Sequence, residues 1–190
     1  PGIDNRGPFL SMNPFSSRCC QHNHAQGWPY FAEHLVLATP DNGAAIALYA
    51  ACKATLKVAD GQEITLHEQT NYPFEEKISF TVNTTEDVRF PFYLRIPSWC
   101  DQPELAINGK QKEIDPIPGK YIYIDRTWTD GDKVELNLPM KLSIHTWQVN
   151  KNSVSVNYGP LTLSLKINEE YIQKAVSYTH LRAHETELHL

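Results

Sequence analysis

Short stretches in which apolar and polar residues alternate, separated by turn residues, occupy most of the chain after residue 43. In residues 77–83, for example, Ile78, Phe80 and Val82 fall on one side of an extended chain and polar side chains on the other. Pairs such as Asp60-Gly61 and Asn108-Gly109 mark turns between such stretches. The pattern predicts strands at 45–50, 52–59, 63–68, 77–83, 89–96, 104–108, 120–125, 133–138, 143–147, 153–157 and 161–167.

Many short strands with regular turn signals are typical of an antiparallel β-sandwich. We therefore expect a mainly β fold, with one β-sandwich domain over residues 43–167. The side chains expected inside it are Ile78, Phe80, Val82, Tyr93, Val134, Leu136 and Leu138.

The region before the strands has a different pattern. Residues 1–22 are polar and contain three prolines, which predicts a loop. In residues 23–38, Trp28, Phe31 and Leu35 follow helical spacing, with Pro29 in the first turn and Pro40 after the end. A single amphipathic helix cannot bury its own apolar face, so residues 1–42 are expected to be the end of another domain.

The last residues, 168–190, form a tail that continues no strand pattern. From about residue 176 the tail resembles the translation of a sequencing adapter, and we expect it not to belong to the native protein. His180 and His184 have the spacing of a helical metal pair, but in such a segment this is weak evidence for a metal site. The first residues have no start Met and no secretion signal, so the chain is expected to be a piece of a longer protein.

Composition narrows the class of protein. Lys and Arg total 17 against 22 Asp and Glu, and 41% of residues are apolar. This composition supports a packed core and argues against a disordered chain and against a nucleic-acid-binding protein. No apolar run reaches the roughly 20 residues of a membrane helix, so no membrane partner is expected.

Four cysteines are present, and two of them are adjacent. Cys52 lies within an apolar stretch and Cys100 follows Trp99, so both are expected to be structural. Cys19 and Cys20 are poor candidates for a disulfide framework, which normally uses spaced cysteines. Without further information a buried structural role for this pair is more common than a site role.

A set of short motifs, in order along the chain, makes a family resemblance specific. The first is Arg18-Cys19-Cys20-Gln21-His22-Asn23, followed by Gly27-Trp28-Pro29-Tyr30. The others are Gln69-Thr70-Asn71-Tyr72-Pro73, Leu94-Arg95-Ile96-Pro97-Ser98-Trp99, Ile107-Asn108-Gly109, Arg126-Thr127-Trp128 with Gly131-Asp132, Leu138-Pro139-Met140 and Tyr158-Gly159-Pro160-Leu161. Over roughly residues 10–167 the chain resembles the β-L-arabinofuranosidase-like glycoside hydrolases.

The resemblance implies a catalytic α/α barrel followed by β-sandwich domains. It implies that Cys19 is the nucleophile and a zinc ligand and that Cys20 is a second zinc ligand. The remaining zinc ligands, a Glu and a Cys, and the acid/base Glu would come from the barrel that should precede this chain. The expected partners are therefore zinc, a plant-type glycan and the missing N-terminal barrel.

Other residues have competing interpretations. His22 and His24 could contact sugar or zinc, but solvated or capping roles are more common for histidines before a helix. The four tryptophans could form a sugar-stacking platform, although core packing is the more common role of Trp at strand ends. They are Trp28, Trp99, Trp128 and Trp147.

The sequence therefore predicts a fragment of a retaining glycoside hydrolase, inactive by itself, whose cysteine nucleophile is activated by zinc. The alternative is a non-catalytic carbohydrate-binding or structural β-sandwich module that retains the cysteine pair by ancestry. A third interpretation is a packing domain that only covers the barrel.

Overall fold

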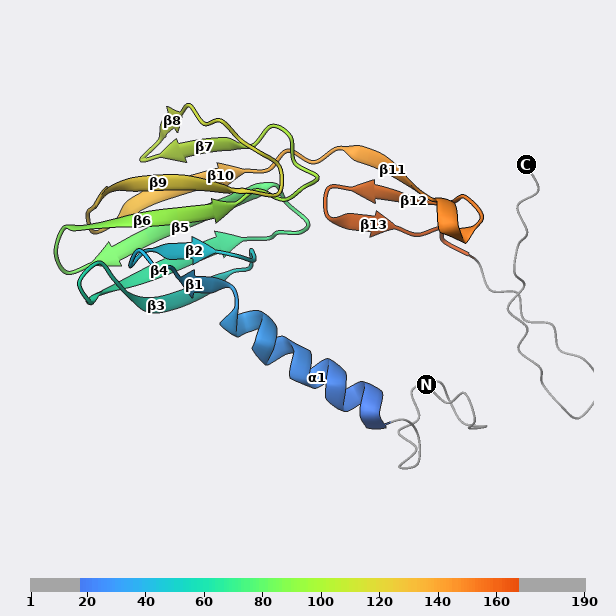
Figure 1. Ribbon diagram of the computed structural model, residues 1–190, viewed down its shortest axis with the longest axis horizontal. Helices are drawn as coiled ribbons and strands as arrows, with labels where there is room; N and C mark the ends of the chain where they lie inside the picture. The colour runs from blue at the N-terminus through green and yellow to red at the C-terminus, as the bar shows by residue number, and fades with distance from the viewer. Residues whose placement is uncertain (1–17, 168–190) are drawn as a thin grey trace, which may run out of the picture.

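The computed structural model describes residues 18–167, which form one helix, a β-sandwich and a separate three-stranded sheet (Figure 1). The first elements are α1 (Arg18–Glu33), β1 (Val36–Ala38) and β2 (Ala44–Ile46). The next are β3 (Cys52–Val58), β4 (Gln62–Thr70), β5 (Lys77–Thr84), β6 (Val88–Arg95), β7 (Glu104–Ile107), β8 (Lys110–Lys112), β9 (Tyr121–Trp128) and β10 (Asp132–Asn137). The last are β11 (Leu142–Trp147), a 3₁₀ turn (Gln148–Asn150), β12 (Ser153–Tyr158) and β13 (Leu161–Leu163).

Two sheets make the sandwich. One has the strand order β1-β2-β6-β9 and the other β3-β4-β5-β10-β7-β8. Neighbouring strands are antiparallel except β2 and β6, which are parallel because the chain passes through the opposite sheet between them. The predicted mainly β sandwich is thus confirmed, with one parallel pair that local sequence patterns do not indicate.

Aromatic side chains from both sheets meet in the core. The rings of Phe80 and Phe92 lie edge to face with centroids 5.6 Å apart, one from each sheet. Trp128 is fully buried beside Phe90, and its indole N–H donates to the Phe90 carbonyl oxygen at 3.0 Å. These contacts join the two layers and satisfy the one polar atom of the indole.

Six of the seven side chains expected in the core are buried: Ile78, Phe80, Val82, Val134, Leu136 and Leu138. The prediction for Tyr93 is wrong. In β6 the buried residues are Val88, Phe90, Phe92 and Leu94, so the pleat turns Tyr93 to the outer face. The run from Pro91 to Leu94 is apolar on both faces, so alternation alone does not show which face is buried.

The helix boundaries also differ from the prediction over 23–38. α1 begins at Arg18, within the polar segment predicted to be a loop, and ends at Glu33. Pro29 therefore lies in the helix interior, where it has no N–H to donate to the preceding turn. Residues expected to end the helix form β1 instead, because Val36 and its neighbours pair with β2.

The strands β11, β12 and β13 form a sheet of their own beyond the sandwich (Figure 1). Its register places Leu142 opposite Tyr158 and Ile144 opposite Val156, so one face of this sheet is apolar. No side chain in residues 141–167 is buried, and Ile144 is 72% exposed. Within residues 18–167, no helix is long and apolar enough to cross a membrane. The tail after residue 167 lies outside the described residues.

Candidate functional site

The cysteine pair lies at the start of α1. Cys19 and Cys20 fall in the first helical turn, and not in a loop before the helix as the sequence suggested. The first backbone N–H groups of a helix lack partners within it and create a positive potential, which favours a thiolate at this position. The side chains of Cys19, Cys20, His22 and His24 lie outside the part of the chain that the structure describes.

The rest of α1 is exposed. Trp28 is 62% exposed, Tyr30 65% and Phe31 37%, and the Trp28 and Phe31 rings meet edge to face. In Figure 1 the helix extends outward from the sandwich. A helix that displays aromatic side chains in this way is typical of an element that packs within another domain.

The junction between α1 and the sandwich is tightly connected. Leu35, just after the helix, is buried, and its carbonyl oxygen accepts a hydrogen bond from the Ala47 N–H at 3.0 Å. Two residues further on, the buried Tyr49 donates its hydroxyl proton to the Arg95 carbonyl oxygen at 2.5 Å. Its ring also packs edge to face on Tyr72. The end of the cysteine-bearing helix is therefore anchored to β2 and, through Tyr49, to the end of β6.

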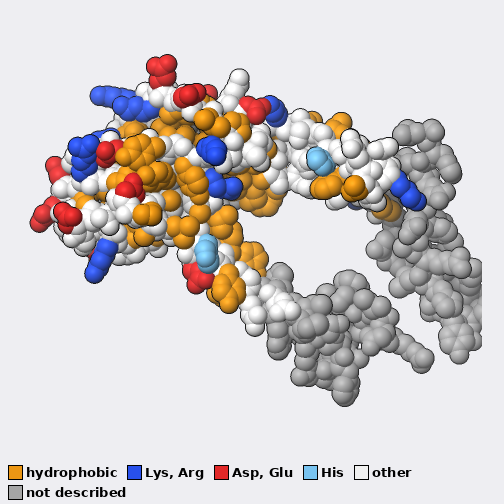
Figure 2. Space-filling view, viewed as in Figure 1, with side chains coloured by type: hydrophobic (Ala, Val, Ile, Leu, Met, Phe, Trp, Pro, Cys, Tyr) orange, Lys and Arg blue, Asp and Glu red, His pale blue; other side chains and the backbone are white. Residues whose placement is uncertain are grey.

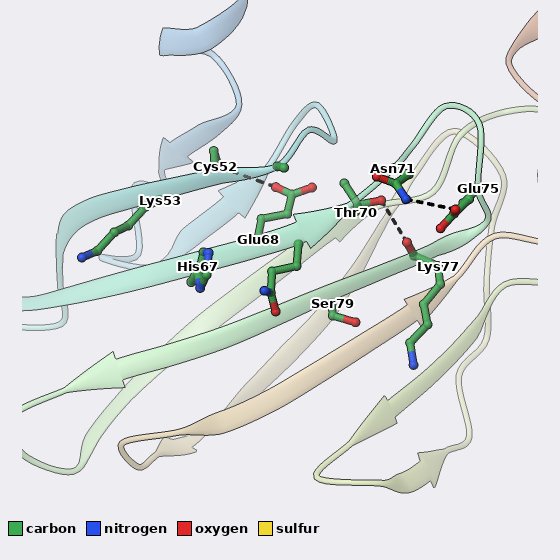
Figure 3. A pocket seen from close by; sticks show the side chains of 11 residues that line it. Cys52, Lys53, His67, Glu68, Thr70, Asn71, Glu75, Lys77 and Ser79 are labelled. Carbon is green, nitrogen blue, oxygen red and sulfur yellow. Dashed lines mark hydrogen bonds between the residues drawn. The ribbon is translucent and has the colours of Figure 1, made fainter.

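A shallow groove of about 640 Å³ lies over β3, β4 and β5, with Glu68 and Cys52 along it (Figure 3). Glu68 is 1% exposed, and burial raises its pKa to about 8 despite hydrogen bonds from the Ala50 backbone and the Cys52 thiol. Burial, followed by the nearby Glu68 carboxylate, raises the pKa of Cys52 to about 11. Cys52 is thus a protonated thiol at neutral pH and a poor nucleophile.

The described residues contain no other candidate metal centre. Among the side chains that the structure describes, which leave out those of residues 18–22 and 24, no group of three or more His, Cys, Asp or Glu is arranged to hold a metal ion. Cys52 is half-buried, Cys100 is buried, and both are free thiols within the sandwich. The cysteine pair of α1 remains the candidate site in this chain.

The tryptophans do not form one platform. Trp128 is fully buried and Trp99 packs against the core, whereas Trp28 and Trp147 are exposed on separate elements. Glu68 was not singled out in the sequence, although it continues the buried alternation of Ile64 and Leu66 along β4. An acidic residue at a core position of an alternating strand is the sequence pattern that could have identified Glu68 as a buried carboxyl group.

The fold and the helix junction together define a β-sandwich domain joined to an exposed helix. Residues 43–140 match the family model described as β-L-arabinofuranosidase, GH127 middle domain. The chain therefore belongs to the GH127 β-L-arabinofuranosidase family and contains its middle domain.

Solved structures agree with this assignment. A GH127 β-L-arabinofuranosidase from Geobacillus stearothermophilus T6 is 30% identical over 76% of this chain, with a TM-score of 0.69. A structure described as a glycoside hydrolase is 28% identical over 83% of this chain, with a TM-score of 0.71. A further GH127 β-arabinofuranosidase is 26% identical over 76% of this chain, with a TM-score of 0.66.

The matched region is a small part of those proteins. It covers 23%, 27% and 25% of the three solved chains, respectively. A search of the curated proteins finds no match.

Proposed function

We propose that the complete protein is a retaining glycoside hydrolase that cleaves terminal β-L-arabinofuranosides, and that Cys19 is its nucleophile. Membership of the GH127 family, whose matching solved members are described as arabinofuranosidases, is the observation that carries the substrate class. The position of the cysteine pair in the first turn of α1 supports the choice of nucleophile.

The chemistry assigned to Cys19 requires an ionised sulfur. A free thiol has a pKa near 8.5, so only a few per cent is thiolate at neutral pH. The N-terminal end of α1 favours the thiolate form of both cysteines. Two adjacent thiols are also the soft donors that zinc prefers, and they supply half of a four-ligand site. When bound, zinc would hold both sulfurs in the thiolate form at neutral pH.

In the first step the Cys19 sulfur attacks the anomeric carbon, and the bond from that carbon to the leaving oxygen breaks. A carboxylic acid of the preceding domain protonates the leaving oxygen. In the second step the resulting carboxylate takes a proton from water, and the water oxygen attacks the anomeric carbon. The carbon–sulfur bond then breaks and Cys19 is released as a thiolate, so two inversions give retention.

The sandwich contributes by fixing the helix that carries the nucleophile. The Leu35–Ala47 and Tyr49–Arg95 hydrogen bonds hold the end of α1 against a rigid scaffold. Catalytic groups held on rigid elements keep the short distances that attack requires.

The test uses the complete protein, including the domain that precedes this chain, with 4-nitrophenyl β-L-arabinofuranoside as substrate. Cys19→Ala is expected to lower kcat at least a thousandfold, because the attacking atom is removed. Cys20→Ala is expected to lower both turnover and bound zinc, measured by elemental analysis of the purified protein. Cys52→Ala is the matched control and should retain activity and zinc. Near-normal turnover of Cys19→Ala would show that the pair is structural.

A further inference from the structure

Three tyrosines lie on the outer face of the four-stranded sheet. Tyr93 of β6 and Tyr123 of β9 are direct neighbours across the strands, and their ring centroids are 5.1 Å apart at an interplanar angle of 53°. Tyr121 lies two residues before Tyr123 on the same face. We call Tyr93, Tyr121 and Tyr123 the tyrosine platform. Tyr121 is 45% exposed and Tyr123 57% exposed.

The polar groups beside the tyrosine platform are held in place. The Tyr93 hydroxyl donates to Oδ2 of Asp41 at 2.5 Å, and the Thr39 hydroxyl donates to Oδ1 of the same carboxylate. Arg89 donates from Nε and Nη2 to the two carboxylate oxygens of Asp125, at 3.2 and 2.9 Å. Fixed partners of this kind reduce the ordering cost that a ligand would otherwise incur on binding.

The charged groups beside the platform have partners. Asp125 is neutralised by Arg89, and Asp41 accepts hydrogen bonds from the hydroxyls of Tyr93 and Thr39. Carboxylates and a guanidinium partnered in this way can bond the hydroxyls of a neutral ligand, and they do not form the cationic patch that an anionic polymer requires. Figure 2 shows hydrophobic side chains on the sandwich in this view, with charged side chains of both signs around them.

The side chains also distinguish a sugar from a protein partner. Protein interfaces are depleted of charged residues at their centre, whereas Asp41, Asp125 and Arg89 lie directly beside these rings. An aromatic face with a few fixed hydrogen-bonding groups suits a sugar ring, which has apolar C–H surfaces and a rim of hydroxyls. Tyr121 and Tyr123 are about 7 Å apart along the strand, so neighbouring sugars of one chain can each meet a ring.

We propose that the tyrosine platform is a second, non-catalytic binding surface for a neutral arabinose-containing glycan chain. The proposal rests on the proposed function, because it takes the substrate of the complete enzyme as the source of the ligand. In this arrangement Tyr123 stacks on a sugar ring, and Asp41, Asp125 and Arg89 bond its hydroxyls. The surface would retain a polymeric substrate while its ends react at the distant cysteine site.

The experiment is affinity electrophoresis of the full 190-residue chain in native gels with and without a neutral polyacrylamide polymer that carries β-L-arabinofuranosyl oligosaccharides. We expect the chain to be retarded by this polymer, and Tyr123→Ala to weaken the retardation at least fivefold. Tyr30→Ala removes a tyrosine on α1 that is 65% exposed, against 57% for Tyr123, and it is the matched control with unchanged retardation. Tyr121→Ala is the second variant, and thermal melting confirms that each variant is folded.

The proposal would be overturned if the unsubstituted chain were not retarded, or if the folded Tyr121→Ala and Tyr123→Ala variants were retarded as strongly as the unsubstituted chain. So would a complete protein in which Tyr123→Ala impairs hydrolysis of the small aryl substrate, because the face would then be a contact with the catalytic domain. Hydrolysis of 4-nitrophenyl β-L-arabinofuranoside tests the proposed function alone, because this substrate has one sugar and cannot span to the platform. Retardation without such hydrolysis would support the platform and overturn the assigned activity.

Discussion

The thiol of Cys52 lies 3.8 Å from Oε2 of Glu68, its direct neighbour across strands β3 and β4. The other carboxyl oxygen of Glu68 is buried and has no hydrogen-bond partner among the described residues. Burial in this setting favours the neutral acid over the carboxylate. The pair is therefore a source of pH-dependent stability within the sandwich.

The first prediction concerns Glu68→Gln. Burial raises the Glu68 pKa from 4.5 to about 8, so between these values the folded chain retains a proton that the unfolded chain releases. Stability should fall as pH rises from about 4.5 to about 8 and then remain level. Glu68→Gln removes this titration and should raise the melting temperature at pH 9 by on the order of 5 °C. Melting curves at pH 5 and pH 9 provide the check, and an unchanged pH dependence in the variant would exclude Glu68 as its cause.

The second prediction concerns Gly43, which is buried between β1 and β6. A Cβ atom at this position would lie 2.2 Å from the Pro91 carbonyl oxygen and 2.9 Å from the Thr39 hydroxyl. Since the nearest atom belongs to backbone, Gly43→Ala should destabilise the chain by about 1–3 kcal/mol in urea unfolding. Gly27→Ala is the control, because a Cβ there meets no atom within 4 Å and Ala favours the helix.

The third prediction is that the 190-residue chain has no glycosidase turnover by itself. Two thiols cannot complete a four-ligand zinc site, and catalytic groups that act as a unit fail together. A panel of 4-nitrophenyl glycosides, assayed with added zinc at high protein concentration, should show no release above a Cys19→Ala control. Release that depends on Cys19 would mean that residues of this chain supply the acid as well.

The fourth prediction concerns the apolar face of the separate sheet. Ile144 and Val156 are opposite each other and are 72% and 38% exposed. Exposed apolar sheet faces promote self-association. The double variant Ile144→Thr and Val156→Thr should lower the self-association of the chain in analytical ultracentrifugation. The same variant should leave the melting temperature of the sandwich unchanged, because neither residue contributes to its core. Equal association of variant and parent would place the contact on another surface.

Much of the fold could be predicted from the sequence where the evidence is local. The strand at Lys77–Thr84 alternates apolar and polar residues, and a period of two places Ile78, Phe80 and Val82 on the buried face. The cysteine pair and the ordered motifs likewise identify the family without any coordinates, since motif order is a property of the chain itself.

Other features depend on which segments meet in space. Tyr93 lies in a run with apolar residues on both faces of the strand. The sheet buries the face that carries Phe92, so Tyr93 and its cross-strand neighbour Tyr123 lie on the outer face. Val36–Ala38 becomes a strand because hydrogen bonds to β2 are available there, although its composition also suits a helix. The free-energy difference between helix and strand propensities is smaller than the contribution of one or two such tertiary contacts. The tertiary structure therefore decides both cases, and it also decides on which face of the sheet the tyrosine platform lies.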